Sequence, residues 1–423
     1  MELRKQPPPI RPLRYRDASH EFLPHVVKFS GGRSSAALVL EMAPAGVLSA
    51  ERGDVILFAN TSAEHPRTYE FAARCCEEIE REFGLPWFWY EFCTVEDAYR
   101  GVYRRRLSYR LVTRRPVEED PDGYRSRGET FEELLSFQGM LPNPHSRSCT
   151  AKLKLYPAHL LLEEWLGGTA GPCHDGHYSN RSFVDRDASE RRYRANRGTD
   201  DSGSFRTRVA CVLRQPPSRR RQRWSDFTGA DATSGRTGEG RPVTLWGRRP
   251  AEFVTLLGLR ADEQPRVWRI LDRTLFAEGA GSAKCAIRTQ PPGEHPYFPL
   301  ADSGWTASDV DTYWSARARG PELPAGAGNC VFCFMKGTHD LRAVAQRRDP
   351  DRVADTPSDI GWWDRIERRY RHKAPARNGS GLAVFGFFGV NGPSYAAIAG
   401  RDRATCSSSN PGTTWPNTVG LTD

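Results

Sequence analysis

The stretch that decides the fold is His25-Val-Val-Lys-Phe-Ser-Gly-Gly-Arg-Ser-Ser-Ala-Ala-Leu-Val-Leu-Glu-Met42. Its first five residues predict a short strand, residues 30–35 a turn, and residues 36–42 the first turns of a helix. Residues 55–59 are then an apolar run typical of a buried strand, and residues 67–83 carry apolar side chains at helical spacing. Strands that alternate with helices predict an α/β fold with a parallel sheet wound with helices.

The composition excludes some classes of protein. Hydrophobic residues make up 38% of the 423 residues, enough for a sizeable core, and the length suggests two or three domains or one large domain with insertions. No apolar run reaches the roughly 18 residues that a membrane span needs, and residues 1–16 lack the apolar stretch of a secretory signal. We therefore expect a cytoplasmic protein with no membrane partner, whose ten cysteines are reduced.

Changes in composition along the chain predict its organisation. Residues 171–250 contain 17 Arg against 9 acidic residues and little apolar periodicity, which suggests a basic, mobile insertion. The net charge of the whole chain is +9, so this segment carries most of the excess. The other expected parts are an arm rich in Pro and Arg at 1–20, the first part of the sheet at 21–170, its last strand at 251–280, a Cys-containing and helical region at 281–373, and a Gly- and Ser-rich tail at 374–423.

The turn after the first strand has the chemistry of an anion site. Its two glycines allow backbone N–H groups to converge on a ligand, and the following helix adds the positive end of its dipole. The spacing and the Lys of a Walker A loop are absent, and an ordinary tight turn is the alternative interpretation. If the turn holds a phosphate or pyrophosphate group, its candidate ligands are Phe29, Ser30, Gly31, Gly32, Arg33, Ser34 and Ser35.

Two further loops are expected at the same edge of the sheet. Residues 60–64 end the second predicted strand, and Arg260 and Arg266 follow another strand at residues 252–259. Ligands of open α/β sheets bind at the carboxyl ends of the strands, so these loops would line one crevice. Arg260 and Arg266 could clamp phosphates, with Glu263 orienting one of them; a surface ion pair is the alternative.

Several short motifs together resemble one family. Phe29-Ser-Gly-Gly-Arg-Ser-Ser35 resembles the PP-loop of the phosphoadenosine phosphosulfate (PAPS) reductase-like family, and Phe58-Ala-Asn-Thr-Ser-Ala-Glu-His-Pro-Arg-Thr-Tyr-Glu-Phe71 resembles its next motif. The resemblance covers about residues 25–340 and skips the basic insertion. The motifs that follow in family order are Ser148-Cys-Thr-Ala-Lys-Leu-Lys-Leu-Tyr-Pro157, Gly258-Leu-Arg-Ala-Asp-Glu263 with Arg266, Tyr297-Phe-Pro-Leu300, and Gly328-Asn-Cys-Val-Phe-Cys-Phe-Met-Lys-Gly337.

This resemblance implies a fold, a ligand and a reaction. The fold would be adenine nucleotide α-hydrolase-like (Rossmann-like), and the ligand ATP or a PAPS-like adenine nucleotide, with Mg²⁺ beside it. The implied enzyme is an ATP pyrophosphatase that cleaves at the α-phosphate and supports sulfur transfer, as in DNA phosphorothioation. Ser34 stands where many PP-loops have an Asp linked to magnesium or phosphate positioning. The implied roles are catalysis by Arg33, Ser34, Ser35 and Arg260, and nucleotide binding by residues 29–35 with Asn60, Thr61, Glu64, Arg260 and Arg266.

Cysteines provide a second candidate site. Cys330-Val-Phe-Cys333 is a CxxC pair, which is half of a metal site, and thiolate ligation favours an iron–sulfur cluster or zinc. The resemblance adds Cys149 as the distant partner and implies a [4Fe–4S] cluster. Cys285 is the first candidate for the fourth ligand, with His295 and His339 as alternatives. A redox dithiol at Cys330 and Cys333, and cysteines that only pack, are the other interpretations.

Two Arg-rich segments suggest contact with nucleic acid. Tyr residues interleave with Arg at residues 99–115, a pattern that suits backbone phosphates and base stacking, and residues 218–224 repeat it inside the insertion. A solvated face and a flexible loop are the alternative. The candidate residues are Arg104, Arg105, Arg106, Arg110, Arg219, Arg220 and Arg221.

Two other functions stay open. A sulfonucleotide reductase that acts on PAPS needs a nucleophilic C-terminal cysteine in a Glu-Cys-Gly type of motif, and this chain offers Cys406 in Ala404-Thr-Cys-Ser-Ser. An accessory subunit would bind a nucleotide and nucleic acid without catalysis, beside partner proteins of a sulfur-transfer, defence or mobile-element system. Release of pyrophosphate from ATP, or of sulfite from PAPS, separates these functions.

Overall fold

The computed structural model describes residues 11–99, 102–144, 147–167, 184–185, 253–277, 294–317, 320, 322–324, 326–328, 330–375, 382–390 and 392–400. The expected insertion at 171–250 therefore lies outside the described residues, except for 184–185. The same holds for four candidate site residues, which are Cys285, Arg219, Arg220 and Arg221.

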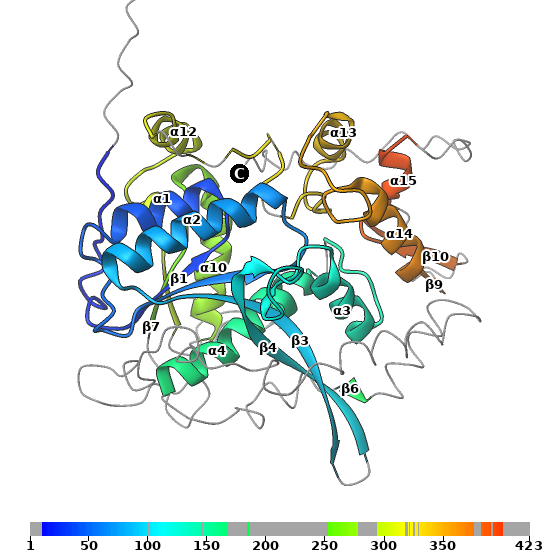
Figure 1. Cartoon of the computed structure of the whole chain (residues 1–423), viewed down its shortest axis with the longest axis horizontal. Coiled ribbons are helices and arrows are strands. Elements are labelled where there is room, and N and C mark those ends of the chain that lie inside the picture. The colour runs from blue at the N-terminus through cyan, green and yellow to red at the C-terminus, as the bar shows by residue number, and fades with distance from the viewer. Residues whose placement is uncertain are drawn as a thin grey trace, which may run out of the picture.

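The centre of the protein is an eight-stranded sheet with a parallel middle part (Figure 1). β4 (Val102–Pro116) runs antiparallel to β3 (Trp87–Tyr99) and also bonds to β5 (Gly123–Tyr124) and β6 (Val184–Asp185). The mostly parallel sheet with helices confirms the predicted α/β class. In spatial order the parallel strands are β3 (Trp87–Tyr99), β2 (Val55–Asn60), β1 (His25–Phe29), β7 (Phe253–Leu256) and β8 (Glu294–Tyr297).

Both faces of this sheet are covered, which explains why its strands are apolar throughout. On one face, Val27 and Phe58 pack with α1 (Arg33–Met42) and α2 (Pro66–Phe83). On the other face, Val26 and Leu57 belong to the cluster formed with α3 (Glu129–Gln138) and α4 (Tyr156–Gly167). Neighbouring residues of a strand point to opposite faces, so each apolar run contributes to both halves of the core.

The C-terminal region joins the core cluster on the second of these faces, where Phe131 of α3 contacts Trp363 and Phe387. Its elements include α13 (Thr338–Gln346), α14 (Ile360–Tyr370) and α15 (Tyr395–Ile398), and a three-stranded sheet of β9 (His372–Pro375), β10 (Leu382–Gly386) and β11 (Gly389–Val390). Phe387 and Tyr395 have no exposed surface. Residues 382–400 were expected in a Gly- and Ser-rich tail, but their aromatic side chains join the core.

The described part of the N-terminal arm also packs on the body. The Arg14 N–H donates to Ser303 Oγ over 3.0 Å, and Trp305 Nε1 donates to the Arg11 carbonyl over 2.8 Å. The contacts lie beside the short helix α11 (Pro299–Asp302). These hydrogen bonds link the start of the described chain to residues that follow β8, the last strand of the main sheet.

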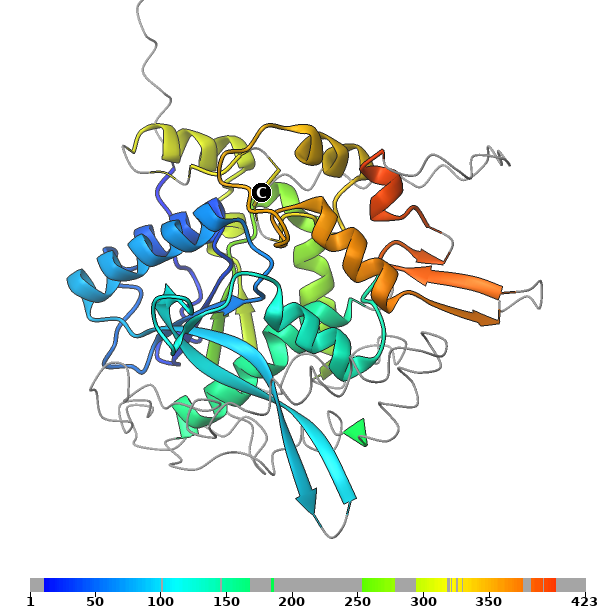
Figure 2. The ribbon, with the colours of Figure 1, turned by 45° about the vertical axis from the view of Figure 1, so that its right-hand side comes forward.

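β3 and β4 extend beyond the body as a long hairpin (Figure 2). The Arg-rich segment at 99–115 is therefore mostly a strand, and the Cα partners of Arg104 and Arg105 across the hairpin are the acidic Asp97 and Glu96. Among the described helices, none combines the length and apolar character needed to cross a membrane.

Candidate functional site

The turn after β1 lies where the strand order of the sheet changes direction. β1 bonds to β2 on one side and to β7 on the other, so the chain moves away from β1 in opposite directions. Ligands of open α/β sheets bind at the carboxyl ends of the strands at such a switch point. The topology therefore brings the loop after β1 and the loop after β7 to one place.

Hydrogen bonds within the first loop fix its shape. Ser35 Oγ donates to the Gly32 carbonyl over 3.0 Å and lies 2.9 Å from Ser30 Oγ. Gly31 has a φ of +78°, and a Cβ there would stand 2.6 Å from Thr68 Cγ2. Only glycine meets both conditions, so the turn is held between its own serines and the first turn of α2.

The first turn of α1 offers backbone N–H groups to a ligand. Among the described residues, no group accepts a hydrogen bond from the N–H of Arg33, Ser34 or Ser35. Ser34 and Ser35 are nonetheless 7% and 3% exposed, and this turn contains no acidic residue. Converging donors and the positive end of the helix dipole are the requirements of a phosphate site.

The loop after β7 brings a buried cation to this turn. Arg260 Nη1 donates to Ser34 Oγ over 3.2 Å, although the two residues are 226 positions apart. Arg260 is 4% exposed, and its Nε donates to Asp262 Oδ1 over 3.0 Å. Glu263 Oε2 lies 3.7 Å from Arg260 Nη1. These carboxylates hold the Arg260 charge beside the α1 N-terminus.

Two of the expected phosphate ligands are engaged elsewhere. Arg33 Nη1 lies 2.6 Å from Asp311 Oδ1 of α12 (Ala307–Ser315), so its charge is directed at that helix. Arg266 forms an ion pair with Glu263, and its side chain is 48% exposed. Of the three arginines, Arg260 is therefore the one whose side chain bonds to the loop after β1.

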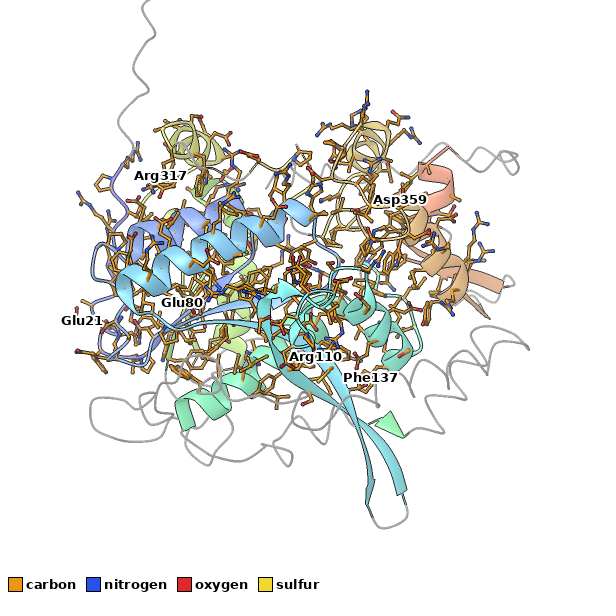
Figure 3. The ribbon with its side chains drawn as sticks, viewed as in Figure 1. Glu21, Glu80, Arg110, Phe137, Arg317 and Asp359 are labelled. Carbon is orange, nitrogen blue, oxygen red and sulfur yellow. The ribbon has the colours of Figure 1, made fainter. Side chains whose placement is uncertain are left out.

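A buried ion cluster lies beneath the end of β2. Asn60 Nδ2 donates to Glu91 Oε1 over 2.7 Å, and Glu91 pairs with Arg110 and Arg125 at 2.7 Å and 3.0 Å. Burial alone would raise the pKa of Glu91, but Arg110 and Arg125 lower it below its ordinary value. Arg110 is 3% exposed and points into the body (Figure 3), so the expectation that it contacts nucleic acid is corrected. The side chains of Arg104, Arg105 and Arg106 lie outside the described part of the chain.

The rest of the loop after β2 is also bonded within the protein. Thr61 Oγ1 donates to Glu64 Oε1 over 2.6 Å, and the Tyr69 hydroxyl donates to Glu64 Oε2 over 3.2 Å. Ser62 has a φ of +58°, and its Oγ accepts from the Thr130 N–H at the start of α3 over 3.0 Å. Asn60, Thr61 and Glu64 are thus buried, and they stabilise the loop by hydrogen bonds within the protein.

The CxxC segment attaches directly to this loop. The Val331 N–H donates to the Ala63 carbonyl over 3.1 Å, and Glu64 and Cys330 form a β-bridge. Lys336 closes the segment because its Nζ donates to the carbonyls of Gly326, Gly328 and Val331 at 2.6, 3.0 and 2.9 Å. The bridge was not identified from the sequence, because it joins segments far apart in the chain. Lys336 was not identified either, although its acceptors lie within ten residues of it.

The structure brings three of the candidate cysteines near one another. A hydrogen bond between Cys330 and Cys333 lowers the pKa of Cys333 below its ordinary value. Burial raises the pKa of Cys149 to about 11, and the charge of Cys333 adds to that rise, which places the two thiols in the same environment. Cys149 lies directly before a π-helical turn (Thr150–Leu155), a feature often found at functional sites.

These residues do not complete a metal site by themselves. Within the described ranges, no group of three or more His, Cys, Asp or Glu side chains is arranged to hold a metal ion. His295, one alternative ligand, stacks on His20 with ring centres 4.1 Å apart. His339, the other, has a 95% exposed side chain. The described donors thus amount to a CxxC pair with a third thiol nearby.

A second buried polar cluster was missed by the sequence analysis. Lys28 of β1 bonds to Glu294 of β8, which also accepts from Thr255 Oγ1 over 2.6 Å. His159 Nε2 of α4 lies 3.8 Å from Glu294 Oε2. Burial lowers the pKa of His159 to about 3. A lysine within an apolar strand was the available signal, because a buried charge requires a partner.

No protein-family model matches this chain, and neither a curated protein nor a solved structure matches it.

Proposed function

We propose that this chain is a PAPS reductase-like PP-loop enzyme that binds ATP at the carboxyl edge of its sheet and cleaves it at the α-phosphate. A substrate oxygen attacks the α-phosphorus, pyrophosphate leaves, and sulfur then displaces AMP from the activated substrate. The observation that supports this best is the pairing of open N–H groups of Ser34 and Ser35 with the buried Arg260. These groups suit the negative charge that grows on pyrophosphate as it leaves.

The proposed roles follow from the contacts at the loop. The N–H groups of residues 33–35 hold the phosphates, and Arg260 neutralises part of their charge. Ser34 stands where many PP-loops have an Asp, and Arg260 bonds to that serine. A guanidinium cation thus faces the phosphates at this position. Mg²⁺ bound with ATP would supply further charge neutralisation.

The thiols are proposed to serve the sulfur-transfer part of the reaction. Cys149, Cys330 and Cys333 would hold an iron–sulfur cluster or zinc together with a ligand from outside the described residues, of which Cys285 is the first candidate. Such a cluster would supply or mobilise sulfur. Since the described donors do not form a metal site alone, no step is assigned to the cluster.

Calorimetric titration with ATP and GTP tests the nucleotide site. We expect ATP to bind and GTP to bind more weakly, and we expect Arg260→Met to weaken ATP binding about 10-fold or more, as for loss of a hydrogen bond to a charged group. Arg365→Met is the control, because Arg365 pairs with Asp355 at the surface. Binding without cleavage would indicate the accessory subunit, a function that the serine at position 34 favours. Sulfite release from PAPS would indicate the reductase.

A further inference from the structure

Helix α10 (Gln264–Ala277) carries an exposed tryptophan just beyond the loop that contains Arg260. Trp268 is 67% exposed, whereas the seven other described tryptophans are 5% exposed or less. A large ring that is left in solvent is available for contact with a ligand. The buried side of the same helix is formed by Val267, which packs with Leu259 and Phe298.

Among the described residues, the charges around Trp268 leave one cation without an ion pair. Arg260 engages Asp262, and Arg266 engages Glu263, which accounts for the two described carboxylates just before α10. Arg269 is exposed and makes no ion pair with any described residue. An exposed aromatic ring and an exposed guanidinium on successive residues suit a base and its phosphate.

The position of α10 connects this surface to the nucleotide site. Arg260 bonds to Ser34, and a short 3₁₀ turn (Ala261–Glu263) leads from it directly into α10. Trp268 lies about 6 Å along the helix axis from Gln264, at about 1.5 Å per residue. A polymer whose reactive group sits at the loop would therefore cross the first turns of α10.

We propose that Trp268 and Arg269 form a docking surface for single-stranded nucleic acid, with one base stacked on Trp268 and a phosphate at Arg269. The strand must be single because stacking on a side chain requires an unpaired base. This inference rests on the proposed function, since it names a nucleic-acid strand as the acceptor held beside the nucleotide site. It places the contact on α10 and not on Arg110, which is buried.

Fluorescence anisotropy of labelled oligonucleotides tests the surface in the full chain. We expect single-stranded oligo(dT) or oligo(rU) to bind more tightly than a duplex of the same length. Trp268→Ala should weaken that binding about 5- to 100-fold, as for loss of one stacked base, and Trp268→Phe should restore part of it. Arg269→Gln should reduce the slope of log affinity against log salt by about 1. Phe22→Ala is the control, because Phe22 is also 67% exposed and lies before β1, outside α10.

The outcomes separate this inference from the proposed function. Equal losses in Trp268→Ala and Phe22→Ala, or no binding of single strands by the wild type, would overturn the docking surface. A change in oligomeric state on Trp268→Ala would also overturn it, because the ring would then bind a second copy of the chain. Loss of ATP binding alone would place Trp268 in the nucleotide pocket and overturn it as well. Trp268-dependent strand binding without any ATP binding would support the surface and contradict the proposed function.

Discussion

The backbone of Gly258 lies against that of Ser35, so that a Cβ at position 258 would stand 2.9 Å from both the N and the Cα of Ser35. The loop after β7 can therefore approach the first turn of α1 only if residue 258 has no side chain. This contact sets the position of Arg260 two residues later, and with it the Nη1–Ser34 hydrogen bond.

Gly258→Ala should separate the two loops. We expect a loss of about 1–3 kcal/mol in the free energy of unfolding, as for overpacking of a close contact, and a larger relative loss in ATP affinity. Chemical denaturation and calorimetry measure the two effects. Gly320→Ala is the control, because a Cβ there meets the Trp314 ring at an ordinary 3.4 Å. Unchanged ATP binding in Gly258→Ala would show that the spacing of the loops does not matter.

Glu91→Gln should destabilise the protein by about 3–5 kcal/mol, because it leaves Arg110 and Arg125 with a buried, uncompensated charge. Since the pKa of Glu91 is lowered in the folded state, its contribution is present above the pKa of an unfolded Glu and is lost as pH falls through the folded value. Urea unfolding at pH 7 and pH 4 measures this. Glu82→Gln at the surface should change stability by less than about 0.5 kcal/mol; equal effects of the two changes would refute the ion cluster.

His159 should make the protein sensitive to mild acid. Burial lowers its pKa to about 3, so the unfolded chain takes up a proton first as pH falls below about 6.5. Between these values the site should reduce stability by about 1.4 kcal/mol per pH unit. His159→Gln should remove that part of the slope between pH 6 and pH 5, whereas His339→Gln, which changes an exposed residue, should not. Parallel slopes for the wild type and His159→Gln would contradict the burial of a neutral His159.

Lys336→Met should loosen the CxxC segment, because three backbone carbonyls lose their charged donor. We expect iodoacetamide to alkylate Cys330 and Cys333 about 10- to 100-fold faster in this variant, as for the loss of hydrogen bonds from a charged donor. Peptide mass spectrometry measures the rate. Lys152→Met is the control from a different element. Alkylation at the wild-type rate would show that Lys336 does not order the segment.

β1, β2 and β7 could be predicted because each is a short apolar run followed by a turn. His25–Phe29 was predicted with its observed bounds, and the helical spacing at 67–83 matches α2 (Pro66–Phe83). The position of the loop after β1 at the sheet's carboxyl edge followed from the alternation of strands and helices. Local sequence patterns are therefore enough to predict where this turn lies in the fold.

The arginines could not be sorted from the sequence. Arg110 and Arg260 each have a second arginine within a few residues, but Arg110 bonds to a partner 19 residues away across the hairpin, and Arg260 to a serine 226 residues away. Residues 99–115 show no acid, because the carboxylates opposite them lie on the other strand. Pairing between distant segments decides which charge is free, and no single segment contains that information.

The products formed from ATP test the central claim most directly. Purified full-length protein is incubated with ATP and Mg²⁺ under anaerobic conditions, and the nucleotides and phosphates are separated by ion exchange. With water in place of the substrate oxygen as the attacking nucleophile, we predict AMP and pyrophosphate in equal amounts from the wild type, and at least 10-fold less of both from Arg260→Met. Formation of ADP and inorganic phosphate, or unchanged AMP formation in Arg260→Met, would contradict it.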